Sequence, residues 1–183
     1  MRPVLPGLLA LLAVPALANV ASARPITVGA ALGITQSKVD ANADPNTTLD
    51  VFGRLGLNPR LGAQLELQRI QTDTSGTDIR TGTVLLAVDL GSGKHLVPMI
   101  LAGAGLDSAS SGYDSVNGTH IEGGFSLEYR ADGGLVIGGD LRMGGRSIDQ
   151  PKTVPLKGVA YYAPSTISDG EYRAARAYVG VRF

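Results

Sequence analysis

Short segments in which hydrophobic and polar residues alternate recur along almost the whole chain of 183 residues. The last segment, residues 173–183, shows this pattern over most of its length. Its apolar positions are Ala175, Ala177, Val179, Val181 and Phe183, and the intervening positions are Arg176, Tyr178, Gly180 and Arg182. Because a β-strand repeats every two residues, the pattern predicts a strand with one apolar face and one face that carries cations.

Seven earlier segments share this alternation, so the sequence predicts eight strands. The predicted strands are residues 26–36, 48–58, 61–72, 78–90, 95–106, 119–130, 135–146 and 173–183. The connections around 58–60, 91–94 and 131–134 are short, those at 37–47, 107–118 and 147–170 are long, and that at 73–77 is intermediate. An even strand number with alternating faces and alternating connection lengths is typical of transmembrane barrels. We therefore expect an all-β protein, an eight-stranded antiparallel up-and-down transmembrane β-barrel.

Two of the predicted strands are less regular. In residues 78–90, Arg80 falls on the apolar parity, and we expect it near the outer end of the strand, where a bulge or a lipid headgroup accommodates it. Residues 97–105 are apolar on both parities, a pattern that also fits a buried strand of a soluble protein. Pro98 belongs near a strand end or a bulge, where its missing N–H matters least.

The N-terminal segment has the features of an export signal. Arg2 precedes an apolar run over residues 4–18, and small residues follow it. This pattern predicts a signal peptide over residues 1–23 that is removed to leave a barrel domain over 24–183, with cleavage after Ala18 as the alternative. No later apolar run approaches the ~20 residues that a spanning helix needs. If the remaining chain crosses a membrane, it must therefore do so with strands.

Composition narrows the class of protein further. Lys and Arg number 16, as do Asp and Glu, so no net charge steers the chain toward nucleic acid. Cysteine is absent, so no disulfide framework holds the fold together. Tryptophan is also absent and aromatic residues make up only 5%. We expect only a thin aromatic girdle at the membrane interfaces, formed by Phe125, Tyr129, Tyr172 and Phe183.

Charged residues on the inward parity are the main candidates for chemistry. They have mixed sign and are Asp50, Arg54, Glu66, Glu122, Glu128, Arg130, Asp140, Arg142 and Arg176. Side chains fill most of the bore of an eight-stranded barrel. Opposite charges in such an interior should pair, so we expect a plug of ion pairs. The alternative is a small pore whose selectivity is set by Arg54, Arg142 and Arg176.

Four stretches give the chain a likeness to a known family, namely residues 55–62, 97–105, 124–130 and 178–183. With these, the region from residue 26 to residue 183 resembles the small eight-stranded outer-membrane β-barrels typified by the OmpA transmembrane domain and OmpX. The resemblance implies a place in the outer membrane, among its lipids and lipopolysaccharide, and an unidentified ligand at the external loops. It also implies insertion by the barrel-assembly machinery, which would read Tyr178, Val179, Val181 and Phe183.

The sequence favours a structural or surface-interaction role over catalysis. Related eight-stranded barrels include lipid A deacylases and palmitoyltransferases, which makes His120 with Glu122 a candidate pair. The residue two positions after His120 is Glu122 rather than serine, and no Ser/His/acid spacing emerges. We therefore expect no catalytic residue and no enzyme activity, with a lipid A-modifying enzyme as the alternative.

No cofactor or metal site is expected. Zinc-ligand spacing is missing, and the Asp-rich segments at 40–50 and 107–114 do not match a known Ca²⁺ loop. We interpret these segments as solvated turns. The remaining alternative is a soluble periplasmic β-barrel that turns its apolar faces inward to bind an apolar ligand.

Overall fold

The computed structural model describes residues 24–37, 45–71, 78–91, 93, 95–111, 114–148 and 170–183. Eight strands form one closed barrel in which each strand pairs with its neighbours in sequence and β8 closes on β1. The strands are β1 Ile26–Ser37, β2 Asn46–Gly56, β3 Leu61–Gln71, β4 Asp78–Asp89, β5 Leu96–Ser111, β6 Asp114–Arg130, β7 Leu135–Ile148 and β8 Gly170–Arg182. All pairings are antiparallel. The predicted fold class is therefore confirmed.

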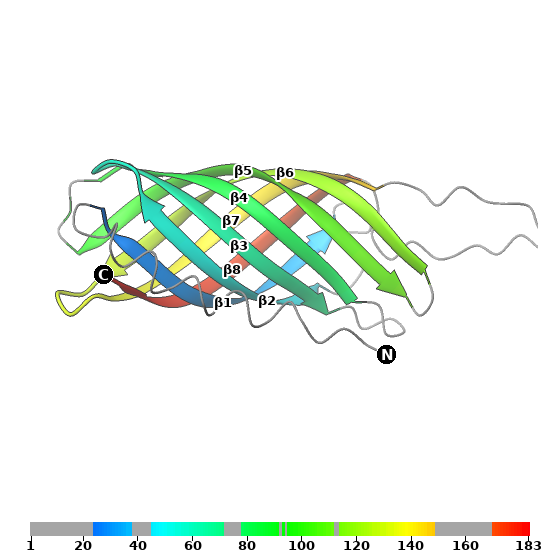
Figure 1. Ribbon diagram of the computed structural model, residues 1–183, viewed down its shortest axis with the longest axis horizontal. Helices are drawn as coiled ribbons and strands as arrows, with labels where there is room; N and C mark the ends of the chain where they lie inside the picture. The colour runs from blue at the N-terminus through cyan, green and yellow to red at the C-terminus, as the bar shows by residue number, and fades with distance from the viewer. Residues whose placement is uncertain are drawn as a thin grey trace, which may run out of the picture.

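The strands run obliquely around a long barrel, and the C-terminus lies at the end that carries the short turns (Figure 1). At that end, the turn between β6 and β7 uses Gly134 with φ of +83°, a conformation that glycine adopts without steric cost. The N–H of Gly134 donates to the Ala131 carbonyl, and the Gly134 carbonyl accepts from the Arg182 N–H at 2.7 Å. Among the described residues there is no helix long and apolar enough to cross a membrane.

The apolar faces of the strands point outward. Leu49, Leu65, Leu127 and Val179 are 43–56% exposed, whereas Glu66 is 2% exposed and Arg142 is 4% exposed. An apolar exterior around a charged interior is the arrangement that a bilayer stabilises. The alternative of a soluble barrel with an apolar interior is therefore wrong for this chain.

The interior is not uniformly polar. Leu85, Ala87 and Leu101 form one buried apolar cluster, and Ile70, Ile79 and Ala109 form another. The first cluster comes from β4 and β5, which carry apolar residues on both parities, a pattern that the sequence left ambiguous, and the second combines residues near the ends of β3, β4 and β5. Their inward members fill the bore between the charged groups, so the interior resembles a packed core more than a water-filled lumen.

Each large ring in the interior lies opposite a glycine on a neighbouring strand. Phe52 pairs with Gly29, Tyr178 with Gly138, Tyr172 with Gly144 and His120 with Gly105. A Cβ added at any of these glycines would collide with the ring that it faces. The glycines therefore provide the space in which the rings lie flat against the barrel wall.

The connection predicted at residues 107–118 is wrong. β5 continues to Ser111 and β6 starts at Asp114, so the two strands form the longest hairpin of the barrel. Asp107 is 3% exposed and points inward, so it is not part of a solvated turn. The Ser, Gly and Asp content suggested a loop, but the inward parity of Asp107 lets it form an ion pair inside the barrel. The predicted signal peptide and most of the other long connections lie outside the described residues.

Three of the four predicted girdle residues and Arg80 lie on the outer surface. Phe125, Tyr129 and Phe183 are 47–71% exposed and face outward, but Tyr172 is 7% exposed and faces the interior. The girdle prediction was wrong for Tyr172 because β8 begins before residue 173 and carries its inward parity back to that position. Arg80 is exposed and lies near the start of β4, as expected for the outer end of that strand.

Candidate functional site

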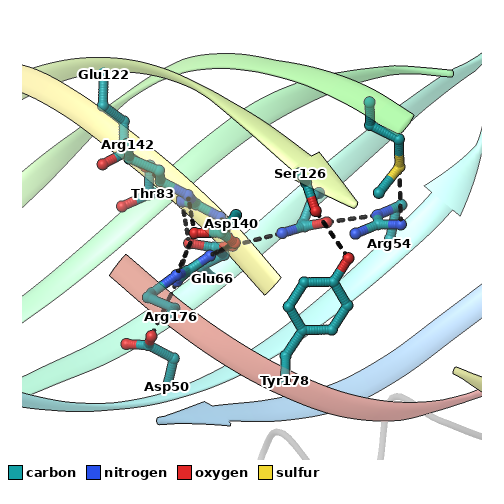
Figure 2. A network of polar contacts seen from close by, with 12 residues as sticks. Asp50, Arg54, Glu66, Thr83, Glu122, Ser126, Asp140, Arg142, Arg176 and Tyr178 are labelled. Carbon is teal, nitrogen blue, oxygen red and sulfur yellow. Dashed lines mark hydrogen bonds and ion pairs between the residues drawn. The ribbon is translucent and has the colours of Figure 1, made fainter. Parts of the chain in front are cut away.

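The structure places all nine inward charges of the predicted set in the barrel interior, and each forms at least one ion pair. Figure 2 shows that most of these side chains gather in one central group, with Arg54 separated from it along the bore. The central group, which we call the central cluster, consists of Asp50, Glu66, Glu122, Asp140, Arg142 and Arg176.

Arg142 on β7 connects three carboxylates in the central cluster. Two of its guanidinium nitrogens donate to the two oxygens of Glu66, both at 2.7 Å. The guanidinium also donates to Glu122 at 2.6 Å and to both oxygens of Asp140 at 3.1 Å. This planar, forked geometry is the one in which arginine binds carboxylates most strongly.

Arg176 on β8 binds the same carboxylates from the other side. It donates to Asp140 at 2.7 and 3.0 Å, to Glu66 at 2.9 and 3.0 Å, and to Asp50 at 2.9 Å. Glu66 and Asp140 are thus held between two guanidinium groups, as Figure 2 shows. Because the side chains come from β2, β3, β6, β7 and β8, the cluster ties together strands that are far apart around the barrel.

The central cluster contains more acids than bases. Its four carboxyl groups and two arginines give a formal charge of 2 − 4 = −2 if all are ionised. The side chains of its members are at most 8% exposed. Unpaired charge at this depth is costly, so each arginine is needed to satisfy several acids at once.

A second set of ion pairs lies toward the short turns. Arg54 donates to Glu128 at 2.7 Å and to the side chain of Gln64. Arg130 donates to the other oxygen of Glu128 at 2.6 Å and to Asp89 at 2.9 Å. Gln64 also donates to Glu66, so this set is joined to the central cluster by one polar side chain.

Tyr178 fills the space beside this second set. Its hydroxyl donates to Glu128 at 3.1 Å and lies 2.9 Å from the hydroxyl of Ser126. Its ring packs edge-on against Phe52, with centroids 5.5 Å apart. The interior is therefore closed at this level by rings as well as by ion pairs.

A third polar group lies toward the opposite end, where the connections are long. Arg146 donates to Asp107 at 2.8 Å, and the Asp107 carboxylate lies 3.1 Å from Nδ1 of His120. His120 Nε2 lies 3.1 Å from the hydroxyl of Thr83. The Tyr172 hydroxyl donates to Glu122 at 2.7 Å, which links this end to the central cluster.

Several members of these groups were not among the predicted site residues. They are Gln64, Thr83, Asp89, Asp107, His120, Ser126, Arg146 and Tyr172, together with Thr81, whose hydroxyl donates to Asp107 at 2.8 Å. Tyr178 was predicted only as part of the assembly signal. For Asp107 the signal was available, because it shares parity with Met99 and Leu101, but the loop assignment hid it. The pairing that the sequence suggested for His120 is also different in the structure, because the carboxylate beside its Nδ1 belongs to Asp107 rather than to Glu122.

Among the described residues, no group of three or more His, Cys, Asp or Glu side chains is arranged to hold a metal ion.

The four residues of the predicted assembly signal do not share one face of the barrel. Val179, Val181 and Phe183 are exposed on the outer surface, whereas Tyr178 is buried in the interior. In the folded barrel, only the first three side chains are accessible from outside.

Comparison with known proteins agrees with this architecture. A family model described as "Outer membrane protein beta-barrel domain" matches residues 7–183. Among curated protein sequences none matches the chain. Solved structures with the same fold include Neisserial surface protein A, with 11% identity and a TM-score of 0.63, where the match covers 87% of this chain and 97% of that one.

Two other structures are similar over a comparable length. Ail of Yersinia pestis shares 16% identity with a TM-score of 0.53, covering 87% of this chain and 97% of that one. A major outer membrane protein of Thermus thermophilus shares 15% identity with a TM-score of 0.59, covering 88% and 100%. With the family match over nearly its whole length, the chain belongs to the outer membrane protein β-barrel domain family and is an outer-membrane protein.

Proposed function

We propose that the protein is a structural barrel of the outer membrane. Its interior neither conducts ions nor catalyses a reaction, and it interacts with its surroundings through its outer rim and external connections. The observation that carries this proposal is the continuity of the interior contacts. Hydrogen bonds and ion pairs run from Tyr172 through Glu122, Arg142 and Glu66 to Gln64, Arg54 and Glu128. Little room is left for a hydrated ion between them.

Planar-bilayer conductance tests the closed interior. Purified protein inserted from detergent should give no ionic current, because both arginines of the central cluster are held in place by several acids. A variant with Glu66→Ala and Arg176→Ala should give small current steps, since it removes the shared partners of the cluster. Steady current through the unmodified protein would show a pore and would refute the proposal.

Asp107, His120 and Thr83 lie in the order of an acid–base–nucleophile triad, which is the feature that would favour an enzyme. Three observations argue against it. All three side chains are 3% exposed, they face the interior while lipid lies outside, and the backbone N–H groups around them belong to the strand ladder rather than to an oxyanion hole. Mass spectrometry of lipid A from cells with the unmodified protein and with His120→Ala should give identical profiles, and a difference would favour an enzyme.

Lipopolysaccharide is the partner that we propose for the outer rim. Arg69 and Arg80 are paired across β3 and β4 and both side chains are exposed on the outer surface, directly beyond the apolar pair Leu67 and Gly82. Two guanidinium groups at one level of the outer surface concentrate positive charge there, and such groups bind phosphate oxygens well. Phosphate groups of lipopolysaccharide in the outer leaflet are the anions that we propose for this position.

Vesicles of phosphatidylcholine with and without lipopolysaccharide test this contact. Lipopolysaccharide should raise the urea midpoint of unfolding for the unmodified barrel, and the increase should be smaller for Arg69→Gln/Arg80→Gln. Arg24→Gln/Arg60→Gln makes the same change of charge at the opposite end and should retain the full increase. Equal increases in both variants would exclude the rim as the contact.

The external connections are the proposed site for a ligand of the cell surface. Ail, one of the structural neighbours, has been crystallised in complex with the heparin analogue sucrose octasulfate. For the present chain we propose only that a ligand binds at the end of the barrel that carries the long connections. Loss of surface binding when residues 149–169 are replaced by a short Gly/Ser linker, with the barrel still folded, would support it, and retained binding would exclude that connection.

Assembly is the remaining part of the proposal. We propose that the insertion machinery recognises β8 through Tyr178, Val179, Val181 and Phe183 in its unpaired state, when Tyr178 is still accessible, after a signal peptide over residues 1–23 has directed export. Phe183→Ala should lower the amount of folded barrel in the membrane fraction, whereas the exposed Leu127→Ala should not. Equal amounts for both variants would exclude a special role of Phe183.

A further inference from the structure

The short-turn end of the bore holds a cavity with an unusual balance of charge. Its volume is about 540 Å³, and its lining includes Arg24, Arg54, Arg60, Arg130 and Arg182 with Asp89 as the one acid among the described lining residues. Ligand sites for small molecules commonly have volumes of about 300–1,000 Å³. The cavity is therefore large enough for a small solute and is lined mainly by cations.

Small residues create the hollow. Gly56, Gly62 and Ala87 lie on the inward parity near the ends of β2, β3 and β4, and they pair across the sheet at the same level. A Cβ placed at Gly62 would lie 3.3 Å from the Leu55 carbonyl, which is a tight contact but not the overlap that a Cβ at Gly138 or Gly105 would produce. The floor of the cavity thus lacks the large side chains that fill the centre of the barrel.

Three of the five arginines form no ion pair with the described residues. Arg54 and Arg130 are neutralised by Glu128 and Asp89, which leaves a formal charge of 5 − 2 = +3 on the group. No ion pair or side-chain hydrogen bond joins Arg24, Arg60 or Arg182 to another residue in the part of the chain that the structure describes. Arg182 is half-buried and lies within electrostatic range of Arg54 and Arg130 and of their partners Glu128 and Asp89, so it adds a further cation to two pairs that are already neutral.

Donors from several strands lie at one level of the bore. Thr27 on β1 is buried, and it pairs with Arg54 on β2 and with Arg182 on β8. Arg60 approaches from the turn between β2 and β3, and Arg24 from the chain just before β1. Guanidinium forks match the oxygens of a phosphate group in spacing and in charge.

From this geometry we propose that the cavity is a binding site for a phosphate group, reached from the side of the short turns, which is the periplasmic side in this architecture. The central cluster blocks the bore beyond Glu128, so the cavity is closed at its inner end and does not lead into a channel. Arg60 and Arg182 hold the anion, Thr27 adds a neutral donor, and Arg54 and Arg130 form the inner wall. The phosphate belongs either to a small solute or to the headgroup of a phospholipid in the inner leaflet.

Calorimetric titration with inorganic phosphate tests the site, using the full barrel in phosphatidylcholine nanodiscs. The unmodified protein should bind phosphate, and Arg60→Gln/Arg182→Gln should bind at least about tenfold more weakly, because two charged hydrogen-bond donors are lost. Arg69→Gln/Arg80→Gln removes the same charge from the opposite end and should bind as the unmodified protein does. Absence of binding to the unmodified protein, or equal loss in both variants, would overturn the proposal.

Further arms of the experiment guard against misfolding and identify the source of the phosphate. Arg24→Gln/Arg60→Gln alters only exposed side chains, so it should fold normally and still weaken phosphate binding. If neither this variant nor Arg60→Gln/Arg182→Gln binds phosphate more weakly than the unmodified protein, the proposed site is wrong. Nanodiscs that contain phosphatidylglycerol separate the two sources. Weaker apparent binding of free phosphate there identifies the lipid headgroup as occupant, and unchanged binding identifies a soluble phosphate.

Discussion

The central cluster and the short-turn end of the same bore use arginine in opposite ways. In the centre, Arg142 and Arg176 are outnumbered by acids and each contacts three of them. At the short-turn end the arginines outnumber the acids, and Arg60 and Arg182 face a hollow. The difference shows that arginine closes the bore where carboxylates surround it. Where carboxylates are few, arginine lines a candidate phosphate site.

The largest expected effect distinguishes the two regions by stability. Arg176→Met should lower the free energy of unfolding by about 3–5 kcal/mol, because it leaves Glu66, Asp140 and Asp50 buried with too few partners. Arg182→Met at the short-turn end should change it by less than about 1 kcal/mol, since no ion pair with a described residue is lost. Urea unfolding in vesicles measures both values, and similar losses would erase the distinction.

A second comparison uses one glycine that faces a ring in the packed interior and one glycine at the floor of the cavity. Gly138→Ala should destabilise the barrel by about 1–3 kcal/mol, because the new methyl group overlaps the Tyr178 ring. Gly62→Ala at the cavity floor should lie within about 1 kcal/mol of the unmodified protein, since the preference for alanine over glycine in a strand offsets the close approach of the new methyl group to the Leu55 carbonyl at 3.3 Å. The same unfolding measurement applies, and a larger loss for Gly62→Ala would show that the floor is already packed.

A single hydroxyl gives the next effect in size. Tyr178→Phe keeps the ring against Phe52 and removes the bonds to Ser126 and Glu128, so a loss of about 1 kcal/mol is expected. Tyr129→Phe, at an exposed position on the outer surface, serves as the matched control and should be neutral. If both variants unfold at the same urea concentration, the interior hydroxyl contributes nothing to closure.

Salt should affect the two regions unequally, although this is the smallest of the expected effects on the fold. Exposed charges are screened at 1 M salt, where the Debye length is about 3 Å, while buried pairs are screened much less. Sodium chloride should therefore weaken phosphate binding at the short-turn end and leave the destabilisation by Arg176→Met nearly unchanged. A strong salt dependence of that destabilisation would mean that water reaches the central cluster.

Much of the fold could be predicted from the sequence because a two-residue period determines which face each side chain occupies. That rule was enough to place Glu66, Arg142 and Arg176 inside and Leu65 and Val179 outside. It failed where composition outweighed parity, as at Asp107, whose Ser- and Gly-rich surroundings suggested a loop. It also placed Tyr172 in a girdle because the start of the last strand was set too late.

The details of the interior could not be predicted from periodicity alone. Parity says that Arg54 and Glu128 both point inward, but the ion pair between β2 and β6 depends on how the barrel closes and how far each strand is shifted. The same holds for the cavity, since Arg24, Arg60 and Arg182 come from separate parts of the chain. Only the closed register brings them around Gly56 and Gly62.

Thiol labelling tests most directly whether the interior is shut at its centre and hollow at its short-turn end, because the chain has no cysteine of its own. Gly62→Cys, Ser126→Cys and Leu65→Cys place one thiol each at the cavity floor, in the closed interior and on the lipid face. A water-soluble maleimide should modify only Gly62→Cys, and a lipid-soluble one should also modify Leu65→Cys. Modification of Ser126→Cys as fast as Gly62→Cys would contradict the account.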